Sequence, residues 1–370
     1  MNKNKGNVFA IAICFFLFAM ISFVTGLQNP MGIIAKAQFG ATNLMSQLGN
    51  AANFIAYAFL GLPAGFLLKG RGYKFSALAA VTVGFVGVGI SYLSGVFGSF
   101  VIYLLGAFVS GFSMCMLNTV VNPMLNTLGG GGNKGNQLIQ FGGSLNSLAA
   151  TIVPVLAGYL IGEVTANTQV ADVNPALFIA MGIFALAFVI IFFSEIPEPE
   201  LEAAAAAPAE EKESVMDSIK GALSHKNLVF GVIAIFLYVG VEVGIPGTMN
   251  FFLTDTLGTA NAATTAGFVA GTYWFLMLIG RFVSSVISGK VSSRTQLAVT
   301  SATAIALVVV AMFTTNVQAS MPVFTGSGFG MAQVPLTALL LVLCGLCTSV
   351  MWGAIFNLSV EGLGKKSAAA

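Results

Sequence analysis

Three asparagines recur at four-residue spacing in the stretch CMLNTVVNPMLNTLGGGGNK, residues 115–134. In a helix, Asn118, Asn122 and Asn126 would share one face, with Pro123 among them. A side-chain amide supplies both hydrogen-bond donors and acceptors, a combination that suits neutral polyols such as sugars. Polar groups are costly in an apolar helix, so these asparagines predict either a hydrophilic cavity or hydrogen bonds that join neighbouring helices.

Polar residues form comparable stripes on three other apolar segments. These stripes are Ser22, Thr25 and Asn29 beside Gln28; Asn50, Asn53 and Tyr57; and Gln137, Gln140, Ser144, Ser147 and Thr151 beside Asn146. For a single serine or threonine we favour interhelical hydrogen bonding, whereas amides that recur on four segments favour a cavity. We therefore predict substrate contacts from these amides and from two tryptophans that can stack on a sugar ring: Asn29, Asn53, Asn118, Asn122, Gln140, Asn146, Trp274 and Trp352.

Two charged residues lie within apolar stretches. Glu242 is about fifteen residues into the segment that begins at 227, where an unpaired acid costs about 2.5–3.5 kcal/mol on insertion scales. We predict that it faces the cavity and exchanges a proton there; the alternative is a structural acid bonded to a neighbouring helix. Arg281 is predicted to be a structural or gating contact, because a depth about 10 Å from that of Glu242 argues against a direct salt bridge.

The composition places these residues in a membrane. The 370 residues are 57% hydrophobic and only 8% charged, whereas a soluble domain carries about 25% charged residues. No Lys/Arg-rich stripe of the kind that binds nucleic acid is present. A membrane-crossing helix needs about 20 apolar residues, and ten segments qualify: 8–27, 44–68, 76–94, 98–127, 137–162, 175–194, 227–253, 264–288, 293–314 and 334–357.

The basic residues predict the topology. Thirteen of the 15 Lys and Arg residues fall on the cytoplasmic side if the N-terminus is inside, as the positive-inside rule requires. Both termini are then cytoplasmic, in the cytoplasmic (inner) membrane of a bacterium. The first span is read as retained rather than cleaved, because no small-residue cleavage site follows a short apolar core.

A charged, Ala/Pro-rich stretch divides the spans. Residues 195–226 separate six spans from four, so we predict an N-terminal six-helix bundle (1–194), a cytoplasmic linker (195–226) and a partial C-terminal bundle of four helices (227–370). Within the linker, 214–224 is compatible with a short amphipathic helix on the membrane surface. Two bundles joined in this way are typical of transporters built from repeats.

Motifs for enzymatic or metal chemistry are weak. Cys344 and Cys347 form C-x-x-C, but there is no second pair and His225 is the only histidine, so apolar packing is the better interpretation. GGGGNKG lacks the G-K-[ST] of a phosphate-binding loop, and no nucleophile–base pair is visible. We therefore predict no enzyme activity, no metal and no cofactor.

Several stretches resemble the major facilitator superfamily and, within it, the fucose–galactose–glucose:proton symporter branch. They are GLPAGFLLKGRGYK (61–74), LNTVVNPMLNTLG (117–129), QFGGSLNSLAATIVPVLAG (140–158), IAIFLYVGVEVGIPG (233–247) and LIGRF (278–282). The resemblance implies an all-α two-bundle transporter, here six plus four spans and so truncated from six plus six. Asn122 and Pro123 match a cavity-facing Asn-Pro motif, and Arg71 belongs to the basic loop after the second span, with a structural or gating role.

The resemblance also implies the function. It predicts a monomeric secondary transporter in membrane lipid that moves a neutral sugar, a hexose or 6-deoxyhexose, with a proton or sodium ion. Asn118 and Asn29 occupy the positions of two acids of fucose-type members, which leaves Glu242 as the acid placed inside the membrane. The alternatives are a non-transporting remnant or sensor on the same scaffold, and an uncoupled facilitator or exporter of another small polar solute.

Overall fold

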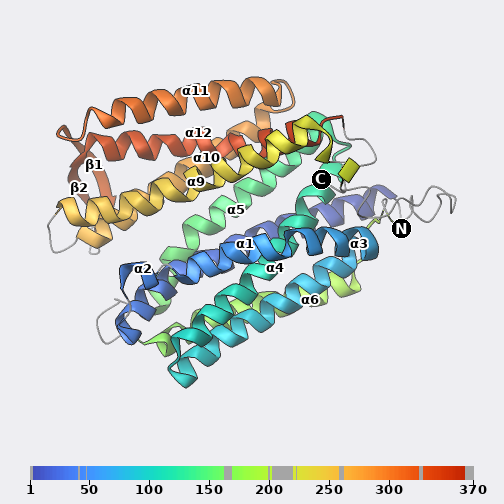
Figure 1. The fold of residues 1–370 in the computed structure, drawn as a ribbon, viewed down its shortest axis with the longest axis horizontal. Helices are drawn as coiled ribbons and strands as arrows, with labels where there is room; N and C mark the ends of the chain where they lie inside the picture. Colours follow the sequence, from blue (N-terminus) through green and yellow to red (C-terminus); the bar gives the residue numbers. More distant parts are fainter. Residues whose placement is uncertain are drawn as a thin grey trace. The chain divides into compact units, whose positions relative to one another are not determined.

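The computed structural model describes residues 3–40, 42–46, 48–161, 169–198, 201, 220–221, 223–257, 262–324 and 328–362. These residues are mostly helical (Figure 1). The elements are α1 (Lys3–Phe39), α2 (Asn43–Ser46), α3 (Leu48–Phe97), α4 (Phe100–Leu128), α5 (Gly132–Ile161), the 3₁₀ helix η1 (Val170–Val173), α6 (Asn174–Phe193), α9 (Lys226–Leu257), α10 (Ala262–Ile287), α11 (Ser293–Met312), β1 (Gln318–Phe324), β2 (Phe329–Pro335) and α12 (Leu336–Val360).

Within this described part, eight helices are long and apolar enough to cross a membrane. The prediction of a helical membrane protein is therefore confirmed. Helix α3, one element of 50 residues, contains the predicted span 76–94 and the span 44–68 from residue 48 on. Helix α5 coincides with the predicted span 137–162 but is not among the eight. Most of the predicted linker, including 214–219 and 222 of the segment 214–224, lies outside the described residues.

A glycine interrupts α3 between its two predicted spans. Gly72 has φ 79° and ψ −177°, a left-handed conformation that glycine adopts without a steric penalty. The backbone N–H groups of Tyr73 and Lys74 each donate a hydrogen bond of 2.7 Å to the carboxylate of Glu198. The Lys74 ammonium donates to the Ser194 carbonyl at 2.8 Å. Glu198 thus caps the helix that restarts after Gly72, with its charge at the favourable end of the helix dipole.

The chain divides into two compact units, which are described separately. The first contains Met1–Leu128 and Leu148–Ile219, and the second contains Gly129–Ser147 and Lys220–Ala368. Helix α5 contributes to both, because its residues up to Ser147 group with the later helices. The predicted boundaries at 194 and 226 stay a prediction.

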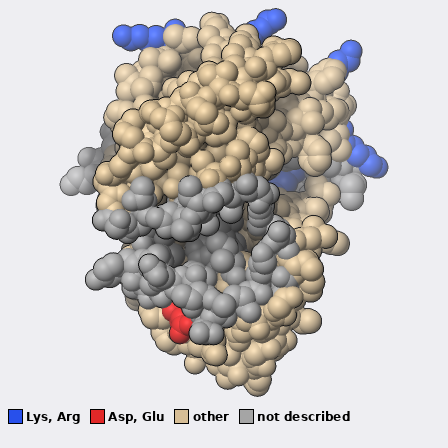
Figure 2. Space-filling view, turned by 90° about the vertical axis from the view of Figure 1, so that its left-hand side faces the viewer, with Lys and Arg blue, Asp and Glu red and all other residues tan. Residues whose placement is uncertain are grey.

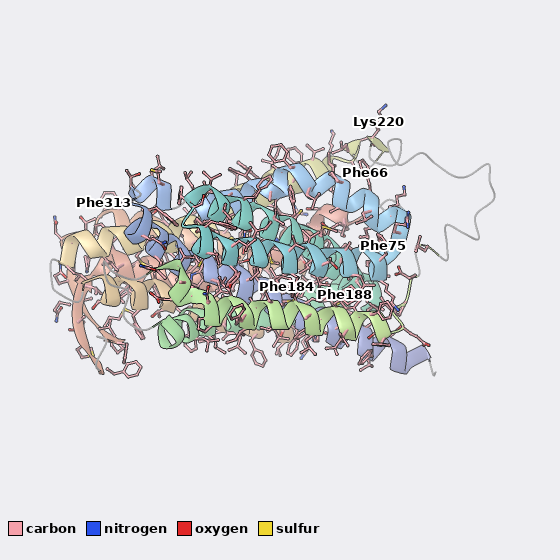
Figure 3. The ribbon with its side chains drawn as sticks, turned by 90° about the horizontal axis from the view of Figure 1, so that it is seen from below. Phe66, Phe75, Phe184, Phe188, Lys220 and Phe313 are labelled. Atoms are coloured by element: carbon pink, nitrogen blue, oxygen red, sulfur yellow. The ribbon has the colours of Figure 1, made fainter. Side chains whose placement is uncertain are left out.

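Small residues bring the helices of the first unit together. A Cβ atom on Gly87 would lie 2.6 Å from the backbone nitrogen of Ser110, and one on Gly106 would lie 2.7 Å from that of Ser91. Close approach through glycine and serine is typical of helix pairs in membranes. Outward-facing aromatics such as Phe75 and Phe188 are exposed while Phe184 is buried (Figure 3), as expected of a bundle whose outer surface meets lipid.

The second unit has its core between α9, α10, α12 and a hairpin that was not predicted from the sequence. Strands β1 and β2 pair antiparallel, with Ser320 opposite Gln333 and Phe324 opposite Phe329. Met321, Val323 and Val334 point inward and join a buried cluster with residues of α9, α10 and α12. The hairpin closes onto α12 through a hydrogen bond from the Leu336 N–H to the Val317 carbonyl, 2.7 Å.

Candidate functional site

Glu242 of α9 and Arg281 of α10 form an ion pair. Nη2 of Arg281 donates to Oε1 of Glu242 at 2.8 Å, and the two side chains are only 10% and 14% exposed. The prediction that the depths of Glu242 and Arg281 argue against a direct salt bridge is therefore wrong. Counted from the connection between α9 and α10, Arg281 is only four residues deeper than Glu242, which is about 6 Å along a helix and within reach of an arginine side chain.

The same guanidinium contacts α5. Nη1 of Arg281 donates to the Ser147 hydroxyl at 2.8 Å and to the Gly143 carbonyl at 3.1 Å. A Cβ atom on residue 143 would lie 3.3 Å from Cδ of Arg281, so the glycine makes room for the arginine. Arg281 therefore uses its fork of donors to join α5, α9 and α10 within the second unit.

Two tyrosines complete the surroundings of the ion pair. Tyr238 lies one turn before Glu242 on α9, is 4% exposed, and interacts electrostatically with both Glu242 and Arg281. Its hydroxyl has no partner at hydrogen-bond geometry among the described residues. Tyr273 of α10 shares a hydrogen bond of 2.8 Å with Thr348 of α12. Tyr238 was not predicted from the sequence, although its spacing of four from Glu242 placed it on the same helix face.

The amide side chains of α5 contact α11 and α12. Gln140 donates to the Val350 carbonyl at 3.2 Å, and Asn136 donates to the Ser293 hydroxyl at 3.5 Å. Gly353 of α12 faces this contact, because a Cβ atom there would lie 2.9 Å from Oδ1 of Asn136. Each of these side-chain amides thus uses one hydrogen-bond donor in this contact and can form further hydrogen bonds.

The remaining predicted substrate contacts of the second unit lie on α5, α10 and α12. Asn146 is half-buried on α5. Trp352 stacks on Phe356 at 5.4 Å and 7°, and Trp274 meets Tyr273 edge-on at 5.5 Å. Both tryptophans are half-buried, so each leaves part of its ring accessible.

In the first unit, Asn118 of α4 meets Tyr57 of α3. The Asn118 amide donates to the Tyr57 hydroxyl at 3.0 Å and to the Met114 carbonyl at 3.1 Å. The Asn122 amide donates to the Asn118 carbonyl at 2.9 Å. Pro123 follows in the same turn and removes a backbone N–H that would otherwise bond the Thr119 carbonyl. The structure thus brings Asn118 and Asn122 together beside Tyr57.

These amides have unused hydrogen-bonding capacity. Nδ2 of Asn53 and Oδ1 of Asn122 and Asn126 are buried and have no hydrogen-bond partner among the described residues. A buried amide atom without a partner costs about 1–3 kcal/mol, so a polar ligand or water that satisfied it would be stabilised. The side chain of Asn29 lies outside the described residues. Arg71 is exposed and lies over the Phe75 ring at 5.1 Å.

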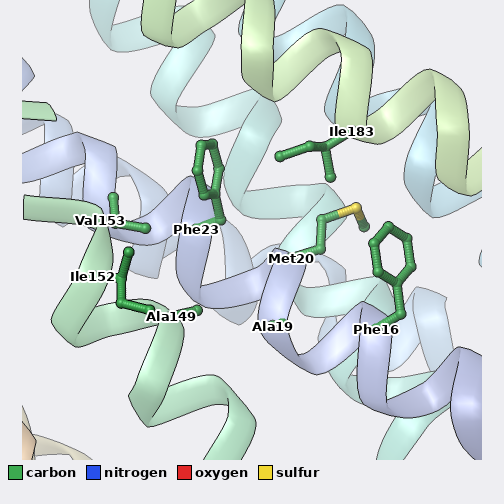
Figure 4. A pocket seen from close by; sticks show the side chains of 8 residues that line it. All are labelled: Phe16, Ala19, Met20, Phe23, Ala149, Ile152, Val153 and Ile183. Carbon is green, nitrogen blue, oxygen red and sulfur yellow. The ribbon is translucent and has the colours of Figure 1, made fainter. Parts of the chain in front are cut away.

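An open cavity in the first unit is apolar, unlike the surroundings of the amides. It measures about 210 Å³ and is lined by Phe16, Ala19, Met20, Phe23, Ala149, Ile152, Val153 and Ile183 (Figure 4). All eight side chains are apolar and come from α1, α5 and α6. None of the predicted site residues lines this cavity, and its surface does not suit a sugar.

Comparison with known proteins identifies the family and the fold of the chain. A sequence model described as the Major Facilitator Superfamily matches residues 11–370. A glucose/galactose transporter of Brucella abortus biovar 1 (strain 9-941) is 27% identical over 368 residues, which cover 98% of this chain and 82% of the relative. The L-fucose-proton symporter of Escherichia coli (strain K12) is 22% identical over 392 residues, covering 99% and 83%.

Solved structures share the fold. A structure of the E. coli fucose:proton symporter, FucP, aligns with a TM-score of 0.76 at 18% identity and covers 98% of this chain and 87% of FucP. The proton:xylose symporter XylE, bound to 6-bromo-6-deoxy-D-glucose, aligns with a TM-score of 0.65 at 12% identity, covering 99% and 86%. At these identities the likeness is one of fold.

Proposed function

The chain belongs to the major facilitator superfamily, and from that membership we propose that it is a secondary active transporter for a neutral sugar. Relatives that match nearly the whole chain carry glucose/galactose transporter and fucose-proton symporter as their names. In this proposal the protein works by alternating access in the cytoplasmic membrane of a bacterium, as a monomer with both termini in the cytoplasm. The substrate is a hexose or 6-deoxyhexose.

The amides Asn53 of α3 and Asn118 and Asn122 of α4 are the observation that carries the sugar proposal. Asn118 and Asn122 are adjacent, and the Oδ1 atom of Asn122 and the Nδ2 atom of Asn53 have no partner among the described residues. Sugar hydroxyls donate and accept hydrogen bonds, so they can satisfy both kinds of atom. Further contacts are proposed from Asn29, Gln140 and Asn146, with stacking on Trp274 and Trp352.

Glu242 is proposed as the coupling residue, with Arg281 as its counter-ion. A proton and the guanidinium compete for the same carboxylate, because a neutral Glu242 would leave a nearly buried arginine without this partner, which is costly. Uptake of a proton would therefore favour a conformation in which Arg281 has moved. A sodium ion could take the same place, since carboxylate oxygens are hard ligands for such cations. Arg71, Pro123 and Arg281 are proposed to have structural or gating roles.

Transport by purified protein in vesicles tests the proposal. Labelled glucose, galactose and fucose would be offered with a proton gradient, with a sodium gradient, and with neither. Accumulation above the external concentration with one gradient supports a coupled sugar transporter. Equilibration that ignores both gradients would support an uncoupled facilitator, and failure to move or bind any of these sugars would contradict the proposed substrate class.

A further inference from the structure

The β1–β2 hairpin presents an uncharged, apolar tip that the transport proposal does not use. No charged residue occurs from Phe313 to Pro335. At the base of the outward face, the Gln333 amide donates to the Ser320 hydroxyl at 2.6 Å. Towards the tip the cross-strand pairs become Pro322 with Met331 and Phe324 with Phe329. The outward face therefore changes from polar to apolar along the hairpin.

The side chains at the tip are strongly exposed. Phe329 is 80% exposed, Met331 67% and Phe324 37%. Phe313, directly after the end of α11, is 82% exposed. Its ring lies at the same end of the second unit as the hairpin (Figure 3). Viewed from the end at which the hairpin lies in Figure 1, most of the described surface is uncharged: Lys and Arg lie chiefly toward its rim, and an acidic patch lies low in the view (Figure 2). A cluster of exposed aromatic side chains of this kind indicates a contact surface.

The tip lies beside a membrane-crossing helix. The rings of Phe329 and Phe268 are 6.0 Å apart and edge-to-face. Phe268 belongs to the membrane-crossing stretch Thr265–Ile287 of α10 and is about 9 Å from the start of that helix. The inward face of the hairpin is fixed by Met321, Val323 and Val334 in the buried core. The tip is thus held at the level of the span ends and does not extend freely into water.

From these observations we propose that the hairpin tip, formed by Pro322, Phe324, Phe329 and Met331, is a lipid-contact surface at the membrane interface. It would insert at the boundary between headgroups and acyl chains, on the side of the membrane opposite Lys290 and Arg294. Aromatic and apolar side chains partition favourably into this zone. The proposal does not depend on which solute the protein carries.

Backbone hydrogen bonding sets the depth. The sheet has two strands, so the outer edge of each faces no further strand among the described residues. Edge N–H and C=O groups need water or headgroup partners, because hydrocarbon offers none. The tip can therefore occupy the interface but not the centre of the bilayer. The outer edges also make pairing with a second copy of the chain the main competing occupant.

Spin labels on the full chain in lipid vesicles test this surface. The four native cysteines are buried and would be replaced by alanine. Labels at the tip would be placed at Phe329→Cys and Met331→Cys. The two reference sites would be Lys290→Cys, exposed in the connection between α10 and α11, and Phe236→Cys, 77% exposed on α9. Accessibility to oxygen, which concentrates in lipid, and to a water-soluble nickel chelate would be measured at each site. Met331 serves as a second reporter if the change at Phe329 disturbs folding.

We expect the oxygen-to-nickel accessibility ratio at both tip positions to be several-fold above that at position 290 and below that at position 236. A ratio equal to that at position 290 would place the tip in water and overturn the proposal. A ratio equal to that at position 236 would place it in hydrocarbon and contradict the interfacial depth. Protection from both reagents, with dipolar broadening between labels, would show that a second copy of the chain covers the tip, which also overturns the proposal.

Discussion

Arg281 donates one hydrogen bond to the carboxylate of Glu242 on α9 and another to the hydroxyl of Ser147 on α5. One nearly buried guanidinium thus neutralises the acid of one helix and contacts the polar stripe of another. A change in the charge of Glu242 therefore alters the free energy of the contact between α10 and α5. This relationship gives the proposed coupling residue a physical route to a change in helix packing.

Removal of the arginine alone should destabilise the protein more than removal of the pair. Arg281→Gln leaves Glu242 without its counter-ion, and breaking a fully buried pair costs about 3–5 kcal/mol. The cost here should be smaller, because both side chains retain some exposure. The double variant Arg281→Gln/Glu242→Gln should recover part of the loss. Thermal unfolding of the two single variants and the double variant in detergent measures this; additive losses would mean that the residues do not interact.

Loss of the Asn122 amide should weaken sugar binding. Asn122→Ala is expected to lower affinity by about 1–3 kcal/mol, the cost of leaving a polar partner of the ligand unsatisfied. Thr119→Ala is the matched control, because the Thr119 hydroxyl donates to the Cys115 carbonyl of its own helix. Calorimetric titration of a binding-competent protein gives both affinities. Equal affinities for Asn122→Ala and the parent would remove Asn122 from the binding site.

A β-carbon should be tolerated at position 70 but not at position 72. Gly72→Ala forces a left-handed conformation on alanine and crowds Glu198 and Leu201, so we expect a loss of roughly 1–3 kcal/mol in stability. Gly70 has a helical conformation with open space around its missing side chain, and Gly70→Ala should be neutral or slightly stabilising. Unfolding temperatures of the two variants decide the matter; equal losses would mean that the break at Gly72 has no special role.

The helical segments were predictable because hydropathy reports on them directly. The predicted span 175–194 agrees with α6 to within a residue at each end. The hairpin was missed because its two seven-residue strands lie between spans and are far too short to cross a membrane as helices. The alternation in QASMPVF and FGMAQVP, around the Gly-rich TGSG, was the available signal. The ion pair was missed because the depth of Glu242 was counted from the start of its span and that of Arg281 from the end of its span. The relative depth of the two residues is fixed instead by the connection between the end of α9 and the start of α10.

The partners of the amides could not be predicted from sequence. Spacing placed Asn118 and Asn122 on one face of α4, but the position of Tyr57 beside them depends on how α3 packs against α4. The contact between Gln140 and the Val350 carbonyl joins residues 210 apart in the chain, and no periodicity encodes it. Periodicity thus indicates which side chains share a face, and only packing determines what that face meets.

Energy coupling at Glu242 is the central claim, and one substitution tests it most directly. Glu242→Gln mimics the protonated acid and keeps its size, and Glu361→Gln, an exposed acid at the end of α12, is the control. In vesicles with an imposed proton gradient, Glu242→Gln should fail to accumulate labelled sugar, yet it should retain sugar counterflow when the pH is equal on both sides. The control should accumulate sugar like the parent. If Glu242→Gln still concentrates sugar with the proton gradient as the only driving force, Glu242 is a structural partner of Arg281 and the account of coupling is wrong.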